Sequence, residues 1–227
     1  MAEFVRYADS LEAPDPGEPE VVGQIIRAMQ RETDKVAKRE RHAVRASHAK
    51  STGLLKGELR VLDRLPPHLA QGLFARPSSY PAVVRFAQGP GETLSDSVST
   101  HRGMAVKLFG VEGPALPGHG GCGTQDFVFA TGTTFPQANS ARFLTAIKGL
   151  EKSTNMPEAV KQAAATAARG ANAVVQAVGG GSPTLGFFGH SKRNPPADAY
   201  FSQAPMRYGD HGQAGLFPGL AGVGRDH

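Results

Sequence analysis

Residues 53 to 132 contain four short segments of strand-forming residues joined by connections rich in glycine and proline. The segments are GLLKGELRVL, AVVRFAQG, GMAVKLFGV and DFVFATG, at residues 53–62, 82–89, 103–111 and 126–132. In the first segment leucine and valine alternate with lysine, glutamate and arginine, which is typical of a strand with one buried face. Because no long helix separates the four segments, we expect an antiparallel sheet, and a β-barrel is one way to close it.

Helical periodicity replaces this pattern on both sides. Residues 19–43 predict a charged helix in which Val22, Ile25, Ile26 and Met29 recur at helical spacing. Two amphipathic helices are expected at residues 137–153 and 156–178, the second opened by a proline near its first turn, and a short helix after Pro66–Pro67. Strands followed by helices indicate an α+β fold.

The length of 227 residues is that of a single domain. Within it the sequence predicts successive segments: an N-terminal arm with the charged helix (1–43), a β-barrel core (44–136), a helical segment (137–178), a region with a further strand at Tyr200–Tyr208 (179–210) and an aperiodic tail (211–227).

The chain is basic, with a formal net charge of +5 and a calculated pI of about 9.5. Residues 31–45 alone contain six lysines and arginines, which raises nucleic-acid binding as an alternative. No aromatic side chains are interleaved to stack on bases, and three acidic residues interrupt the run. We therefore expect a solvated helix or an oligomerisation arm, and no nucleic-acid partner.

Targeting and redox signals are weak. The first thirty residues contain acids and prolines and no apolar stretch typical of a secretory signal, and no segment is apolar enough for a membrane span. The single cysteine, Cys122, excludes an internal disulfide framework. The expectation is a cytoplasmic protein.

Common catalytic and metal motifs are missing. The eight histidines form no HExxH pattern, and we expect no protein-ligated metal site. The glycine-rich stretches GPGE and GHGGCG do not join a strand to a helix, as a phosphate-binding loop requires. His48 remains the strongest candidate, because RASHAK at residues 45–50 places Arg, Ser, His and Lys directly before a strand.

Four ordered motifs give this histidine a context. RASHAK, AVVRFA, GETLSDSVSTHRGMAVKL and TQDFVFATGTTFP follow one another and closely resemble the haem-dependent catalase-like family, particularly its small catalase-related peroxidase-like members. The resemblance covers about residues 40–150 well and 195–210 moderately. It implies a catalase-type antiparallel β-barrel with a helical arm and following helices, haem b as cofactor, and hydrogen peroxide or an organic hydroperoxide as substrate.

The resemblance also implies roles for individual residues. His48 corresponds to the distal histidine, the acid/base that moves a proton between the oxygens of a peroxide. Arg45 and Arg85 correspond to arginines that pair with the haem propionates. Phe135 corresponds to a ring stacked on the distal haem face, and Gly103 to a position where the strand passes close to the porphyrin.

Departures from the family pattern qualify these expectations. Gly123 replaces a distal asparagine and Ala87 replaces a serine. The proximal ligand of the family is a tyrosinate from an R-x-x-x-Y motif, and neither Tyr200 nor Tyr208 has an arginine four residues earlier. The sequence thus predicts a chain truncated before the proximal tyrosine, an incomplete barrel, and weak or absent haem binding.

The leading hypothesis is a haem-dependent peroxide-using oxidoreductase. Rearrangement of fatty-acid hydroperoxides on the same fold is an alternative chemistry. A non-catalytic remnant of such an enzyme, folding partially or as a homo-oligomer, is an alternative of another class. Lys50 and Asp96 also match motif positions, and we expect them to have structural roles.

Overall fold

The computed structural model of the protein describes residues 5–6, 8–11, 13–42, 44–96, 98, 100–113, 121–154, 156–190, 194–203, 206–208 and 211–213. Most of the predicted tail, residues 214–227, lies outside the described residues.

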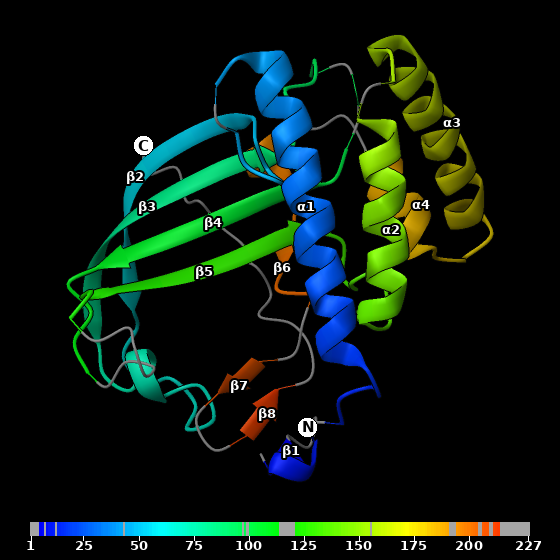
Figure 1. The fold of residues 1–227 in the computed structure, drawn as a ribbon. Helices are drawn as coiled ribbons and strands as arrows, with labels where there is room; N and C mark the ends of the chain where they lie inside the picture. Colours follow the sequence, from blue (N-terminus) through cyan, green and yellow to red (C-terminus); the bar gives the residue numbers. More distant parts are fainter. Residues whose placement is uncertain are drawn as a thin grey trace.

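The centre of the fold is a five-stranded antiparallel sheet with the order β2-β3-β4-β5-β6 (Figure 1). Its strands are β2 (Ser51–Val61), β3 (Ser78–Gln88), β4 (Arg102–Phe109), β5 (Thr124–Thr131) and β6 (Tyr200–Phe201). The four long strands overlap the four segments predicted from the sequence, so the antiparallel sheet and the α+β class are confirmed.

The described strands form an open sheet, with β2 at one edge and β6 at the other. The strand expected at Tyr200–Tyr208 is divided between two sheets. Its first part is β6, and its last part is β7 (Met206–Tyr208), which pairs with β8 (His211–Gln213) and, through β8, with β1 (Val5–Arg6). No closed barrel is present among the described residues.

Four α-helices accompany the sheet in the described part of the chain: α1 (Glu18–Glu40), α2 (Ser140–Ser153), α3 (Glu158–Ala177) and α4 (Pro183–Phe188). The first three confirm the predicted helices, and α1 packs along α2 (Figure 1). The Asn139 side chain caps α2 by accepting a hydrogen bond from the Arg142 amide. Short 3-10 turns lie at Asp9–Leu11, Gly72–Phe74 and Pro195–Ala197.

The prediction of a short helix that begins directly after Pro66–Pro67 is wrong. The Leu69 and Ala70 amides both donate to the Pro66 carbonyl, which makes one isolated turn. Gly72 then has a φ of 55°, a left-handed conformation that ends helical propagation, and only the 3-10 turn follows.

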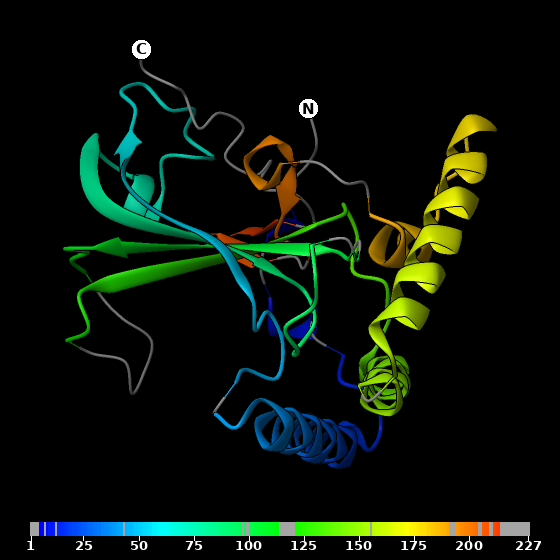
Figure 2. The same cartoon turned by 90° about the horizontal axis from the view of Figure 1, so that it is seen from above.

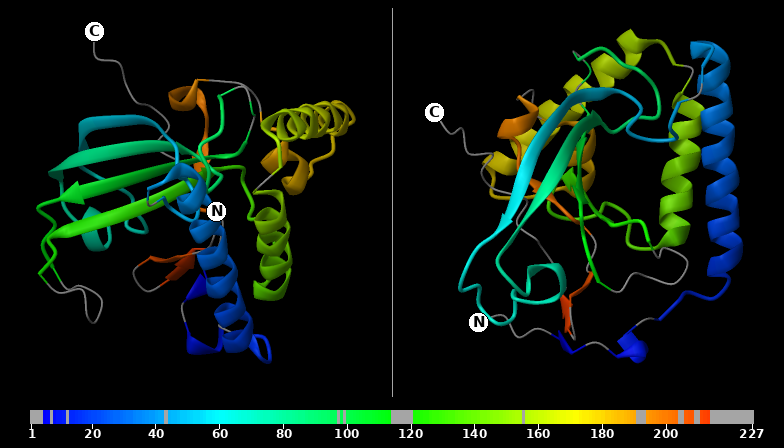
Figure 3. Two further views of the ribbon diagram at one scale, coloured as in Figure 1. Left: turned by 45° about the horizontal axis from the view of Figure 1, so that its top comes forward. Right: turned by 90° about the vertical axis from the view of Figure 1, so that its left-hand side faces the viewer.

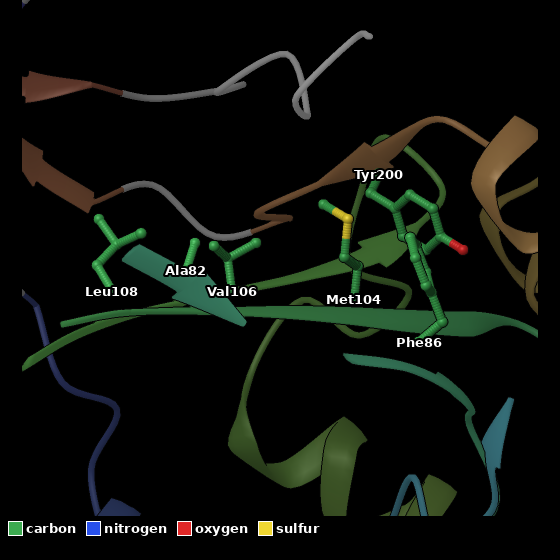
Figure 4. Close-up of a cluster of buried hydrophobic side chains, with 6 residues drawn as sticks. All are labelled: Ala82, Phe86, Met104, Val106, Leu108 and Tyr200. Atoms are coloured by element: carbon green, nitrogen blue, oxygen red, sulfur yellow. The ribbon is translucent and has the colours of Figure 1, made fainter. Parts of the chain in front are cut away.

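The two faces of the sheet differ sharply. One face carries the main hydrophobic core, in which Phe86 and Leu108 are 2% and 0% exposed. Figure 4 shows this cluster, which comprises Ala82, Phe86, Met104, Val106, Leu108 and Tyr200. Figures 2 and 3 show α1 and α2 on the opposite side of the sheet. Burial of each large side chain contributes about 2 kcal/mol, so this cluster stabilises the sheet from its core face.

Ion pairs join the helices in addition to the buried apolar side chains of α1 and α2. Glu151 of α2 accepts from Arg31 and Lys35 of α1 at 3.0 and 3.1 Å. Glu92, which lies in the β3–β4 connection, accepts from Arg39 of α1 and from Lys161 of α3. Several of the basic residues that raised the nucleic-acid alternative therefore pair within the chain. No helix in the described part of the chain is long and apolar enough to cross a membrane.

Candidate functional site

The site lies on the sheet face opposite the core. The strand registers place Leu54, Arg85, Ala105 and Val128 directly beside one another on β2, β3, β4 and β5. Leu54 and Val128 are 67% and 71% exposed, although both are large apolar side chains. Arg85 therefore lies within an uncovered, largely apolar strip.

The neighbouring row of this face contains only small residues. Ala87, Gly103 and Ala130 lie beside one another on β3, β4 and β5. Together with the strip above they make a shallow floor, and we call this surface, with the ring of His48, the His48 face. Ala87 and Gly103 are themselves buried, Gly103 beneath the His48 ring, so the part of this surface that is open to a flat apolar ligand is the strip with Leu54 and Val128.

Gly103 is the point where His48 meets the sheet. A Cβ atom at Gly103 would lie 2.6 Å from Cε1 and 2.7 Å from Nδ1 of His48. These distances are too short for real contacts, so the imidazole occupies space that only glycine leaves free. The structure thus brings together His48 and Gly103, two of the residues predicted from the sequence. Position 103 has to be glycine because the His48 ring occupies the space of a side chain there.

The backbone of His48 is held in an uncommon conformation. Its φ is 53°, in the left-handed region that non-glycine residues rarely adopt. The His48 amide donates to the Gly89 carbonyl at 2.9 Å, and Nη2 of Arg85 donates to the His48 carbonyl at 2.8 Å. Such strain persists only where surrounding contacts enforce it, and it concentrates at functional sites.

Two glycines after β3 make room for neighbouring groups, Gly91 for the segment before His48 and Gly89 for the ring of His101. A Cβ at Gly91 would lie 2.3 Å from the Ala46 carbonyl oxygen, and a Cβ at Gly89 would lie 1.9 Å from Cε1 of His101. The Ala49 amide donates to the Pro90 carbonyl at 3.1 Å. The RASHAK segment therefore packs directly against the GPGE stretch.

The positive charges around His48 are not balanced by acids on the His48 face. The Arg45 side chain is exposed and makes no hydrogen bond or ion pair with the described residues. Burial and the charge of Arg45 lower the pKa of Arg85. Two neighbouring guanidinium groups that repel each other form a site suited to an anion with two charges.

The same surroundings favour neutral imidazole. Burial, the charge of Arg85 and the charge of Arg45 lower the pKa of His48, while a backbone interaction with Gln88 acts in the opposite direction. Nδ1 of His48 is buried and has no hydrogen-bond partner among the described residues. The lowered pKa therefore favours the neutral imidazole, which keeps one N–H and can accept a proton at its other ring nitrogen.

His101 was not singled out by sequence reasoning. Its ring meets His48 edge to face, with centroids 5.7 Å apart, and stacks on Phe187 at 3.6 Å. Burial, followed by the charges of His48 and His190, lowers the pKa of His101 to about 3. His101 is thus a neutral packing partner that fixes the position of the His48 ring. Nothing in the sequence STHRG distinguishes this role.

Lys50 and Asp96 have the structural role expected of them. Nζ of Lys50 donates to Oδ1 of Asp96 at 2.8 Å and to the Leu94 carbonyl at 2.8 Å. Nε2 of Gln88 donates to the same Asp96 oxygen at 2.8 Å. These contacts tie the start of β2 and the end of β3 to the connection that follows β3.

Phe135 lies beyond β5 and is 42% exposed. Its ring contacts Phe143 of α2, with centroids 5.6 Å apart, and the described contacts do not bring it against His48.

The tyrosines with described side chains face away from the site. Tyr80 packs against the core, and the buried Tyr200 donates from its hydroxyl to the Pro195 carbonyl. Burial and the charge of Asp198 raise the pKa of Tyr200 to about 12.

In chemical terms, the His48 face combines a neutral imidazole, the Arg85 guanidinium and exposed apolar side chains, and the charge of Arg45 acts on the first two. No group of three or more His, Cys, Asp or Glu side chains that could hold a metal ion occurs among the described residues. Comparison with protein-family models, with curated proteins and with solved structures finds no match.

Proposed function

We propose that the His48 face is the distal side of a haem site and that the chain derives from a haem-dependent, peroxide-using oxidoreductase. The observation that carries the proposal is the position of the His48 imidazole over Gly103, beside Arg85 and the exposed apolar side chains of Leu54 and Val128. The ordered motifs that resemble the catalase-like family support it independently.

The residues of the site fit a haem on three grounds. The porphyrin is flat and apolar, and the exposed side chains of Leu54 and Val128 on this face are apolar too. The two propionates are anions, and Arg45 and Arg85 lack acidic partners on this face. The imidazole of His48 is a polar group held on this face, with one buried and unpartnered nitrogen.

When bound, haem supplies the iron at which a peroxide is reduced. The chain supplies the proton transfers. His48 is neutral because its pKa is lowered, so it accepts a proton from a peroxide and then returns it to the departing oxygen. The role of Arg45 and Arg85 is to bind the cofactor by its carboxylates.

One observation favours a second candidate, a haem-binding chain without turnover. Tyr200 lies on the core face, its hydroxyl is already bonded, and its pKa is raised, so it does not fit as an anionic axial ligand. Tyr7 and the side chain of Tyr208 lie outside the described residues. A chain with only the distal residues would retain haem weakly and react with peroxide slowly.

Turnover separates the two candidates. The chain is reconstituted with haem, and the consumption of hydrogen peroxide and of a fatty-acid hydroperoxide is measured for wild type and for His48→Gln. The proposed oxidoreductase loses activity by roughly 100-fold or more in the variant, with haem retained. Wild-type activity equal to that of free haem establishes the non-catalytic candidate. Activity restricted to the lipid hydroperoxide, with rearranged products, establishes the alternative chemistry.

A further inference from the structure

A second cleft lies apart from the His48 face. It has a volume of about 720 Å³ and is formed by the end of β5 and the residues after it, by α3 and α4, and by the chain before and after β6. Known ligand pockets span about 300–1,000 Å³, so this cleft is large enough for a small organic molecule. It shares no residue with the His48 face as defined above.

The lining of the cleft is rich in hydroxyl and amide groups. They belong to Thr131, Thr133, Thr134, Asn172, Gln176, Ser182 and Gln203. Such groups both donate and accept hydrogen bonds, so they suit a ligand with several hydroxyl or ester oxygens. Thr131, Ser182 and Gln203 already hydrogen-bond within the chain. The side-chain amides of Asn172 and Gln176 make no such bond with the described residues, so they are the groups most readily used by a ligand.

The acidic charge in the cleft is already neutralised. Asp198 is the only carboxylate among the lining residues. Its Oδ2 accepts from Nη1 of Arg102 at 2.8 Å and contacts Nε2 of His190 at 3.0 Å, and its side chain is 4% exposed. This carboxylate therefore does not attract a cation, nor does it pair with the remaining arginine of the cleft.

That arginine is Arg169 of α3. Its Nη2 donates to Oγ1 of Thr166 at 3.1 Å, whereas Nη1 is buried and has no hydrogen-bond acceptor among the described residues. A guanidinium group stays charged at all physiological pH values, and a buried donor without an acceptor is unfavourable. Because Nη1 is buried, it reaches an anionic oxygen of a ligand in the cleft only after the guanidinium turns, and that oxygen then supplies the missing acceptor.

The position of Arg169 is fixed by close packing. A Cβ at Gly189 would lie 2.6 Å from the Arg169 amide nitrogen, so the end of α4 lies directly against α3 at this residue. Asn172, three residues later on α3, lies on the same side of the helix and also lines the cleft. Helix α3 thus presents the guanidinium group of Arg169 and the side-chain amide of Asn172 to the same cleft.

We propose that this cleft binds a small hydroxylated organic anion, a carboxylate or a phosphate ester, through Arg169. The hydroxyl and amide groups of the lining hold the uncharged part of the ligand. Phe187 forms one wall of the cleft, and its ring stacks on His101. Occupancy of the cleft is therefore detectable at the His101 ring as well as at Arg169.

The test is a titration of the full chain, followed by NMR and calorimetry, with glycerol 3-phosphate, glycerate and glycerol as probes. At least one of the two anions is expected to bind saturably, with shifts at Asn172 and at the His101 ring, and glycerol is expected not to bind. Preference for one anion identifies the class. Arg169→Gln should weaken binding about tenfold or more, because a charge-assisted hydrogen bond is lost.

Arg142→Gln is the matched control, since Arg142 is an exposed arginine of α2 outside the cleft. If Arg169→Gln does not fold, Asn172→Asp replaces it, because a carboxylate three residues from Arg169 competes with the ligand for the guanidinium. Absence of anion binding at millimolar concentration, equal binding of glycerol, or equal losses in Arg142→Gln and Arg169→Gln would overturn the proposal.

Discussion

The imidazole of His48 fills the space that a side chain at Gly103 would require, with Cε1 2.6 Å from the position of the missing Cβ. The two residues are far apart in the sequence, yet one determines what the other can be. This contact fixes the ring at the sheet surface. The backbone of His48 is held in a left-handed conformation at the same time.

Gly103→Ala is therefore expected to displace the His48 ring. The added methyl group overlaps the ring, and overpacking of this kind costs about 1–3 kcal/mol. Thermal unfolding measures the loss, and the NMR shift of the His48 Cε1 proton reports the displacement. Gly57→Ala in β2 is the control, because a Cβ there has no atom within 4 Å. Equal effects of the two substitutions would contradict the packing role of Gly103.

Replacement of Arg45 by glutamine should raise the pKa of His48. The charge of Arg45 contributes to the lowered pKa of the ring, and the Arg45 side chain makes no bond with the described residues that its loss would break. An NMR titration of the ring proton gives the pKa directly. Wild type should titrate below the ordinary value of about 6.5, and Arg45→Gln closer to it. An unchanged or lower pKa in the variant would refute the electrostatic account of this site.

Glu32 makes the stability of the helices depend on pH. Burial, then the charges of Glu92 and Glu151, raise the pKa of Glu32 to about 7 from an ordinary value of 4.5. Because the pKa is raised in the folded state, the protonated Glu32 side chain favours folding. This contribution to the stability is fully present below pH 4.5 and is lost as pH rises through 7. Glu32→Gln should therefore be more stable than wild type at pH 8, by on the order of 2 kcal/mol.

Chemical denaturation at pH 5 and pH 8 checks this expectation. The advantage of Glu32→Gln should be larger at pH 8, whereas the exposed Glu20→Gln on the same helix should show no such difference. A stability gain of Glu32→Gln that does not change with pH would show that the glutamate is not the titrating group.

Local pattern predicted the sheet well. In β2 to β5 strand-forming residues lie between glycine and proline turns, and the structure follows these limits within a few residues. The pattern was less informative on α1. Val22 and Ile26 were expected on its apolar face but are 42% and 62% exposed, and the buried stripe is Ile25, Ala28, Glu32 and Val36. A buried glutamate among ion pairs breaks the hydrophobic pattern from which such a face is predicted.

The site was predicted in part. The resemblance indicated His48, Arg85 and Gly103, which the structure places on one face, and Arg45, whose charge acts on the first two. His101, Phe187 and Arg169 were not indicated, because each gains its role from contacts between distant segments that leave no local pattern. Phe135 is the opposite case. A motif indicated it as a site residue, but its described ring contact is with Phe143 of α2.

The central claim, a haem site on the His48 face, is tested most directly by titrating the purified chain with haem and following the Soret absorbance. Saturable but weak binding is predicted, and Arg45→Ala and Arg85→Ala should each weaken it by about tenfold, because each removes a charge-assisted partner of a carboxylate. Arg64→Ala, whose side chain is 93% exposed, should bind as wild type does. A titration without a saturable Soret shift, or one that is the same in all four proteins, would contradict the account.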